Sequence, residues 1–254
     1  MSVETPTEAA LRNITEQNNV RDRELAKNLG LQIEDFTVEE TKEFLLSFNR
    51  MFRLHVMPRV ITEIFNSRMT EIRLAAKVAK AQFNASFGGE TPDSGQYGMV
   101  ITRAGYFGIG DDWGDARPLD AGSITYIIDS GTTRMGGTSG NPVRIGGNAV
   151  HLILAQGTFS QNPITEATRF IIDTKIKPAI PVWFHYLVSD LKIKELDKVR
   201  LFKKGTTVAW QAFSRQGGPD ANYLLGVSFL PEAQLRELDI AALSGSTPDV
   251  VLTT

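Results

Sequence analysis

Three histidines are the first residues to consider for chemistry, because an imidazole can move protons or bind zinc near neutral pH. His55, His151 and His185 lie far apart in apolar runs, and none has a second histidine or a carboxylate three or four positions away. A helical zinc motif needs that spacing to bring two ligands onto one face. The pattern favours packed histidines, and we expect no metal and no cofactor. A zinc or Ser–His–Asp site built from residues distant in the sequence stays open.

An acidic cluster lies in the first of two long Gly-rich connections, Gly105–Leu119. Asp111, Asp112 and Asp115 could supply oxygen ligands to a hard cation. The cluster lacks the regular ligand spacing and the closing glutamate of an EF-hand, which favours an acidic turn. Trp113 in the same loop is a candidate exposed aromatic, suited to a protein interface or to sugar stacking.

The second Gly-rich connection, Gly131–Gly147, contains the stretch GGTSGNP at Gly136–Pro142. A phosphate-binding loop of this kind needs a lysine and a following helix whose N–H groups point at the phosphate. Neither is present in the pattern. The stretch therefore predicts a loop that is flexible or ordered by a partner.

The most specific local pattern is YIIDSGT at Tyr126–Thr132. It resembles the signature of the aspartic proteases, in which two apolar residues precede Asp-Ser/Thr-Gly. The resemblance implies that Asp129 is catalytic and that the chain dimerises to supply the second carboxylate of the dyad. Leu224–Gly226 is similar to the apolar-apolar-Gly segment of the retroviral type. The continuation after Thr132 and the helical first third depart from that family, and Asp-Ser-Gly after a strand is also an ordinary turn.

A basic helix face is the third feature with possible chemistry. Within Ile61–Phe83, apolar side chains recur at helical spacing and predict one buried stripe. This stripe consists of Ile61, Phe65, Met69, Ile72, Ala76, Ala79 and Phe83. The adjoining face carries the basic residues Arg59, Arg73, Lys77 and Lys80. Such a face could follow a phosphate backbone. The simpler interpretation is a solvated or salt-bridged face. If the face is solvated, alanine substitutions of Arg73 and Lys77 should cost little.

The elements that position these residues are predicted to be helices in the first third of the chain and mainly strands after it. A capping box, Thr37 to Glu40, predicts a helix over 38–56, and Pro58 separates it from a second helix over 59–86. Period-two patterns then predict strands. These are Tyr97–Thr102, Ser123–Asp129, Ala149–Ala155, Val199–Phe202, Thr206–Phe213 and Tyr223–Phe229. The last three suggest an antiparallel meander.

Two further segments have less regular patterns. Asn162 as a cap and Pro163 at the first helical position predict a helix over Pro163–Lys175. Ile180–Val188, IPVWFHYLV, indicates a buried run that could be helix or strand.

The pattern therefore predicts an α+β chain: a helical N-terminal region, a mainly antiparallel β domain with long Gly-rich loops, and extended terminal arms. We divide it into an arm at 1–36, a helical region at 37–88, a β-rich domain at 96–230 and a second arm at 231–254. Residues 1–30 carry few apolar side chains, which predicts contacts with other subunits if they are ordered. Val250, Val251 and Leu252 form an uncovered strand candidate, suited to pairing with another chain.

Composition narrows the class of protein. The net charge is −2. Cysteine is absent from the 254 residues, and this absence excludes thiolate zinc sites and disulfide frameworks. No run is long enough to span a membrane, and the N-terminus does not resemble a secretory signal. We expect a protein that folds in the cytoplasm of the producing cell and contacts no membrane.

Together these features predict a non-enzymatic structural subunit of a large repetitive assembly. A virion component such as a phage capsid, neck, tail or baseplate protein is the first choice, with copies of itself and other subunits as partners. Two alternatives remain. One is the homodimeric aspartic protease with Asp129, and the other is a nucleic-acid-binding module using the basic helix face.

Overall fold

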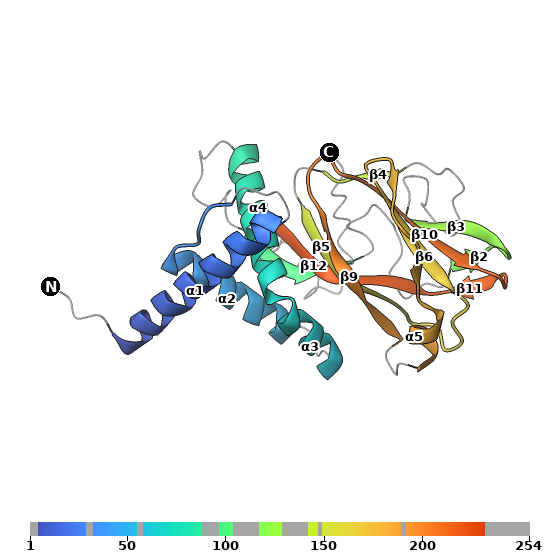
Figure 1. Cartoon of the computed structure of the whole chain (residues 1–254), viewed down its shortest axis with the longest axis horizontal. Coiled ribbons are helices and arrows are strands. Elements are labelled where there is room, and N and C mark those ends of the chain that lie inside the picture. Colours follow the sequence, from blue (N-terminus) through green and yellow to red (C-terminus); the bar gives the residue numbers. More distant parts are fainter. Residues whose placement is uncertain are drawn as a thin grey trace, which may run out of the picture.

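The chain combines a layer of helices with two antiparallel sheets, which makes it an α+β protein (Figure 1). The computed structural model describes residues 5–28, 33–54, 58–87, 97–103, 117–128, 142–146, 149–188 and 192–231. Its helices are α1 (Pro6–Asn28), α2 (Val38–Leu54), α3 (Arg59–Ser67), α4 (Met69–Phe87) and α5 (Trp183–Val188). Among these described helices, none is long and apolar enough to cross a lipid bilayer.

The strands carry the rest of the described chain. They are β1 (Tyr97–Ile101), β2 (Arg117–Leu119), β3 (Ser123–Ile128), β4 (Val143–Arg144), β5 (Val150–Thr158), β6 (Ala167–Ile172), β7 (Lys175–Ile176), β8 (Ile180–Pro181), β9 (Ile193–Phe202), β10 (Thr207–Ser214), β11 (Gly218–Asp220) and β12 (Asn222–Pro231). One sheet has the order β1-β12-β5-β9 and the other β3-β10-β6-β7, with β4 on β10 and β8 on β6. A small ladder joins β2 to β11.

Successive main strands alternate between the two sheets. The chain passes from β1 in the first sheet to β3 in the second, then through β5, β6, β9, β10 and β12 in the same alternation. All the pairings within these sheets are antiparallel. This is the strand order of a jelly roll, in which two four-stranded sheets face each other.

The predicted meander of the last three strands is therefore wrong, because β9, β10 and β12 are not consecutive neighbours in one sheet. The physical reason is the burial of β12 at all of its positions. A strand of that kind needs cover on both faces of its sheet, whereas a meander commonly leaves one face in water.

Two apolar cores give the first sheet this double cover. Phe44, Phe65 and Phe83 of the helices pack with Leu154 and Phe229 on one face of the sheet. On the other face, the two sheets enclose a second cluster, which includes Ile128, Phe170, Phe202, Trp210 and Leu224. The molecule thus has three layers, in the order helices, first sheet, second sheet (Figure 1).

The helical predictions are largely confirmed. The capping box is formed, with the Thr37 N–H donating to Glu40 Oε2 at 2.8 Å and the Glu40 N–H donating to Thr37 Oγ1 at 3.2 Å. The apolar stripe is buried at Phe65, Ile72 and Phe83. The single helix predicted over 59–86 is interrupted at Arg68, whose φ of −105° and ψ of 19° separate α3 from α4.

The helix predicted over Pro163–Lys175 is wrong, because this segment forms β6 and β7. Buried Asp220 explains the false signal. Its Oδ2 accepts the N–H groups of Ile164 at 3.0 Å and Thr165 at 2.9 Å, so a distant carboxylate satisfies donors that a helix cap would otherwise satisfy. Within β6, Thr168 and Phe170 are buried at the two-residue spacing of a strand.

Candidate functional site

Four large apolar side chains of α5 face solvent. Trp183 is 51 % exposed, Phe184 66 %, Leu187 52 % and Val188 62 %. Ile180–Val188 is therefore not the buried run predicted from its composition. It divides into β8 and α5, and only Val182 and Tyr186 of this segment are buried.

Backbone hydrogen bonds fix the start of α5 against the connection between β5 and β6. The N–H groups of Val182 and Trp183 both donate to the Glu166 carbonyl oxygen, at 2.9 and 3.2 Å. On the inner side of the helix, Tyr186 is completely buried. Burial and the nearby Asp220 raise the pKa of Tyr186 well above its usual value, so its ring packs as a neutral group. The exposed residues are thus presented on an anchored helix.

Phe159 adds a further aromatic side chain at the same end of the sandwich. It directly follows β5, is 60 % exposed, and stacks on Tyr223 with ring centroids 4.4 Å apart. The pairings of Gly157 with Ile193 and of Thr158 with Asn222 show that β5 ends where β9 and β12 begin. Because α5 immediately precedes β9, Phe159 and α5 lie at the same end of the sandwich. We call Phe159, Trp183, Phe184, Leu187 and Val188 the loop-end surface.

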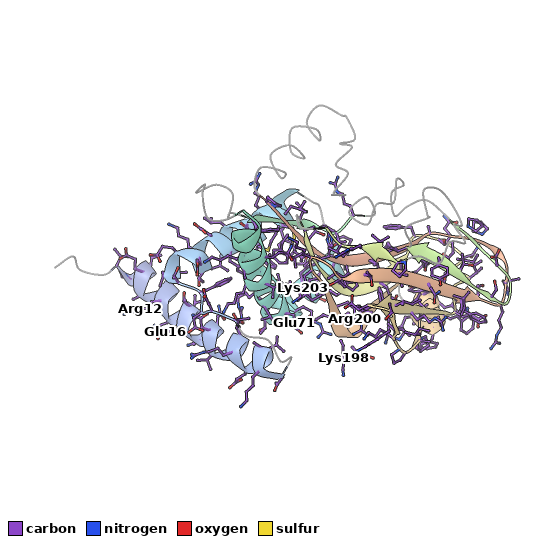
Figure 2. The ribbon with its side chains drawn as sticks, turned by 90° about the horizontal axis from the view of Figure 1, so that it is seen from above. Arg12, Glu16, Glu71, Lys198, Arg200 and Lys203 are labelled. Carbon is purple, nitrogen blue, oxygen red and sulfur yellow. The ribbon has the colours of Figure 1, made fainter. Side chains whose placement is uncertain are left out.

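Edge strand β9 differs sharply from this surface. It is the outermost strand of its sheet in the described chain and carries Lys194, Glu195, Asp197, Lys198 and Arg200. Lys198 and Arg200 are labelled in Figure 2. Charged side chains on an edge strand discourage pairing with another chain's strand. We therefore locate the candidate interface at the loop-end surface and not at this edge.

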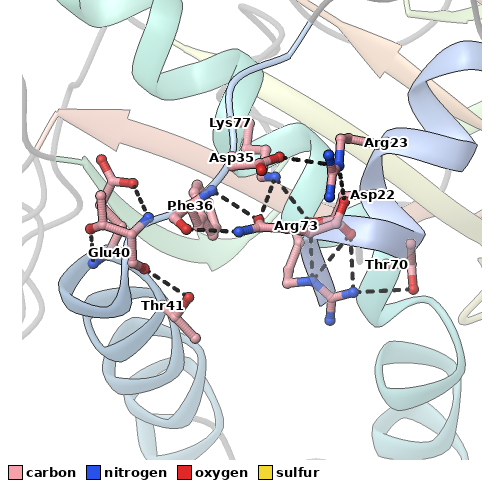
Figure 3. A network of polar contacts seen from close by, with 11 residues as sticks. Asp22, Arg23, Asp35, Phe36, Glu40, Thr41, Thr70, Arg73 and Lys77 are labelled. Atoms are coloured by element: carbon pink, nitrogen blue, oxygen red, sulfur yellow. Dashed lines mark hydrogen bonds and ion pairs between the residues drawn. The ribbon is translucent and has the colours of Figure 1, made fainter. Parts of the chain in front are cut away.

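The predicted basic face has a different role from the one expected. Arg73 and Lys77 are buried, and both pair with the fully buried Asp22 of α1 (Figure 3). Asp22 Oδ1 lies 3.0 Å from Arg73 Nη2, and Asp22 Oδ2 lies 3.2 Å from Lys77 Nζ. We call Asp22, Arg73 and Lys77 the α1–α4 ion cluster. Of the two alternatives in the simpler interpretation, the salt-bridged face is confirmed for Arg73 and Lys77. The solvated face is wrong for these two residues, because α1 covers them.

The other two basic residues point to exposed or half-buried carboxylates. Arg59 pairs with Glu63 at 2.7 Å, and Lys80 pairs with Glu40 of α2. The four cations therefore share no open face that could follow a phosphate backbone. This removes the structural basis of the nucleic-acid alternative for these residues.

Asn19 completes the contact between α1 and the helical layer. Its Nδ2 donates to the Phe36 carbonyl oxygen at 2.8 Å, and its Oδ1 accepts the Phe36 N–H at 2.9 Å. The residues of α1 that are buried are Thr15, Asn19, Asp22 and Ala26. The segment predicted as an arm along other subunits thus includes a helix that packs on its own chain, mainly through buried polar residues.

The other sequence-based candidates divide into two groups. His151 is buried, with Nδ1 2.8 Å from Ser228 Oγ, as expected for a packed histidine. Outside the described residues lie His55, Asp111, Asp112, Trp113, Asp115, Asp129, Gly136–Asn141, Val250, Val251 and Leu252. Across the described ranges, no group of three His, Asp or Glu side chains is placed to hold a metal ion.

Sequence reasoning missed the loop-end surface because apolar content alone does not show which side of a short helix faces the core. The available signal was the spacing of Val182 and Tyr186, which are four residues apart with apolar residues around them. That spacing marks one inward face and leaves the rest outward. The sequence matches no protein-family model, and no curated protein matches it significantly.

Proposed function

We propose that this protein is a non-enzymatic structural subunit of a large repetitive assembly, and that a virion component is the first choice among such assemblies. The loop-end surface carries the proposal. A cluster of exposed Trp, Phe, Leu and Val side chains on an anchored helix is typical of a protein–protein contact. Its partners would be copies of the same chain and other subunits of the assembly.

The interior of the sandwich supports a structural role. Phe170, Phe202 and Trp210 are fully buried between the two sheets and fill the space in which some jelly rolls bind ligands. Jelly rolls form the shells of many viruses as well as lectin and cupin domains. Because one fold serves several functions, the fold agrees with the proposal without selecting it, and the exposed surface is what supports it.

The size of the surface favours many weak contacts over one strong pair. Full burial of a large apolar side chain contributes roughly 1.5–3 kcal/mol. Since the four α5 side chains are already about half covered, an interface would gain about 1 kcal/mol from each. That sum barely offsets an association cost of roughly 4–15 kcal/mol. Contacts of this strength become stable when each subunit makes several at once.

Self-association of the purified full-length chain tests the proposal. Light scattering over a range of concentrations and negative-stain electron microscopy should reveal multimers or regular particles. The double substitution Trp183→Glu and Phe184→Glu should shift the protein toward monomer without unfolding it, because both side chains are solvent-exposed.

Ile176→Glu provides a matched control. Ile176 is 62 % exposed and lies in β7. β7 pairs with the far end of β6, whereas β8 and α5 adjoin its beginning. This variant should assemble like the parent. A parent protein that stays monomeric at every concentration, or an α5 variant of unchanged mass, would contradict self-assembly through this surface.

A further inference from the structure

The contact between α1 and α4 brings an amine, an amide and a carboxylate together out of water. Lys77 Nζ lies 3.1 Å from Asn19 Oδ1 and 3.2 Å from Asp22 Oδ2. Each of the three residues is at most 6 % exposed. The ring of Phe36 closes another side, with its centroid 4.8 Å from Nζ. Figure 3 shows Lys77, Asp22 and Phe36 close together in this contact.

The groups that meet here are of the kinds that amide exchange requires. An amine attacks a carbonyl carbon once it has lost a proton, and Lys77 is buried with its Nζ 3.1 Å from Asn19 Oδ1. The Asn19 carbonyl oxygen already accepts the Phe36 N–H at 2.9 Å. A backbone donor in that position stabilises negative charge that develops on the oxygen during attack. Asp22 is within reach of Nζ for proton transfer.

We propose that Lys77 and Asn19 form an intramolecular isopeptide bond, with Asp22 as the proton relay. The Lys77 Nζ–Asn19 Cγ bond forms, and the Asn19 Cγ–Nδ2 bond breaks. Lys77 begins as an ammonium group and loses two protons, which Asp22 passes to the departing nitrogen. That nitrogen leaves as an ammonium ion. Atoms and charge balance, and the step needs no oxidant, reductant or second substrate.

The product also has a better charge balance than the starting cluster. One carboxylate, Asp22, faces two buried cations, Arg73 and Lys77. When the bond forms, the positive charge of Lys77 leaves with the ammonium ion. The remaining pair of Asp22 and Arg73 is neutral overall, as a buried ionic contact requires. The bond would tie α1 covalently to α4 in a subunit whose buried α1 residues are otherwise mainly polar.

Mass spectrometry of the full-length protein tests this directly. The denatured chain should be lighter than its sequence mass by one ammonia. Proteolytic mapping should give one branched peptide that joins the Asn19 segment to the Lys77 segment. Lys77→Arg and Asn19→Ser should each abolish the branched peptide. Asp22→Asn should slow its formation and leave an unlinked fraction.

Lys80→Arg is the matched control, because Lys80 lies on the same helix and pairs with Glu40. This variant should form the branched peptide as fully as the parent. The parent protein itself decides the question even if a variant fails to fold. A parent chain of full mass after prolonged incubation near neutral pH, or an ammonia loss that maps to another residue, overturns the proposal. Neither result bears on self-assembly through the loop-end surface.

Discussion

His151 should make the stability of this protein sensitive to acid. Its imidazole is completely buried in β5, where its register partners are Ser228 of β12 and Phe202 of β9. Burial lowers the pKa of His151 from 6.5 to about 3. The folded state therefore resists protonation, whereas the unfolded chain accepts a proton as soon as the pH falls below its ordinary pKa.

The sign and size of the effect follow from this difference. Between the two pKa values the unfolded state binds one more proton, so the free energy of unfolding falls as the pH is lowered. The slope is about 1.4 kcal/mol for each pH unit. The contribution of the neutral imidazole is fully present above pH 6.5 and is lost progressively as the pH approaches 3. From about pH 6.5 to about pH 4.5 the loss should reach roughly 2–3 kcal/mol.

Urea unfolding at a series of pH values, for the parent and for His151→Gln, separates this term from the carboxylates. Glutamine can still hydrogen-bond to Ser228 but does not titrate. The carboxylates act alike in both proteins, so the difference in slope isolates the histidine. Equal slopes below about pH 6.5 would show that His151 is not the source of the acid sensitivity. So would an imidazole that titrates in the folded protein, by NMR, at its ordinary pKa.

Three further substitutions and one control probe the helical layer and the first sheet, each followed by urea unfolding. Phe65→Ala should cost roughly 3–5 kcal/mol because this ring is fully buried, while Val60→Ala at an exposed position should change stability by less than about 0.5 kcal/mol. Asp22→Ala should cost roughly 3–5 kcal/mol if Lys77 is unlinked, because two cations then remain buried without a carboxylate; a near-neutral result would show that the cluster opens to water. Gly226→Ala should cost about 1–3 kcal/mol, since its new methyl group would meet the backbone of Leu152; an unchanged unfolding midpoint would contradict the packing of this bulge.

The periodicity of apolar residues predicted the elements that bury only one of their faces. The stripe through Phe65, Ile72 and Phe83 predicted a helix with one face on a core, and the structure has that helix pair. Six of the seven main strands were also predicted, the exception being β6, although β5, β9 and β12 extend beyond their predicted limits. The order of the strands could not be predicted, since the pairing of β12 with β1 and β5 joins segments distant in sequence. A local pattern contains no information about such partners.

The α1–α4 ion cluster escaped prediction for a related reason. On α4, Arg73 and Lys77 have the spacing of a solvated face, and on α1 Asp22 has the composition of a polar arm. Taken separately, the pattern of each helix correctly predicts that these side chains avoid an apolar core. Only the packing of the two helices together shows that one carboxylate pairs with both cations away from water. The same long-range effect produced the false helix at Pro163–Lys175, where Asp220 acts from another strand.

The loop-end surface shows the opposite error, because side chains that were predicted to be buried are exposed. Trp183, Phe184 and Leu187 have the composition of a core segment, yet they are exposed in a protein whose two cores are otherwise well filled. Exposed aromatic side chains gain nothing for the fold of a lone subunit, and they raise the risk of aggregation. They gain free energy when a neighbouring subunit covers them. For this reason the segment that composition assigns to the core is the one that most strongly supports assembly.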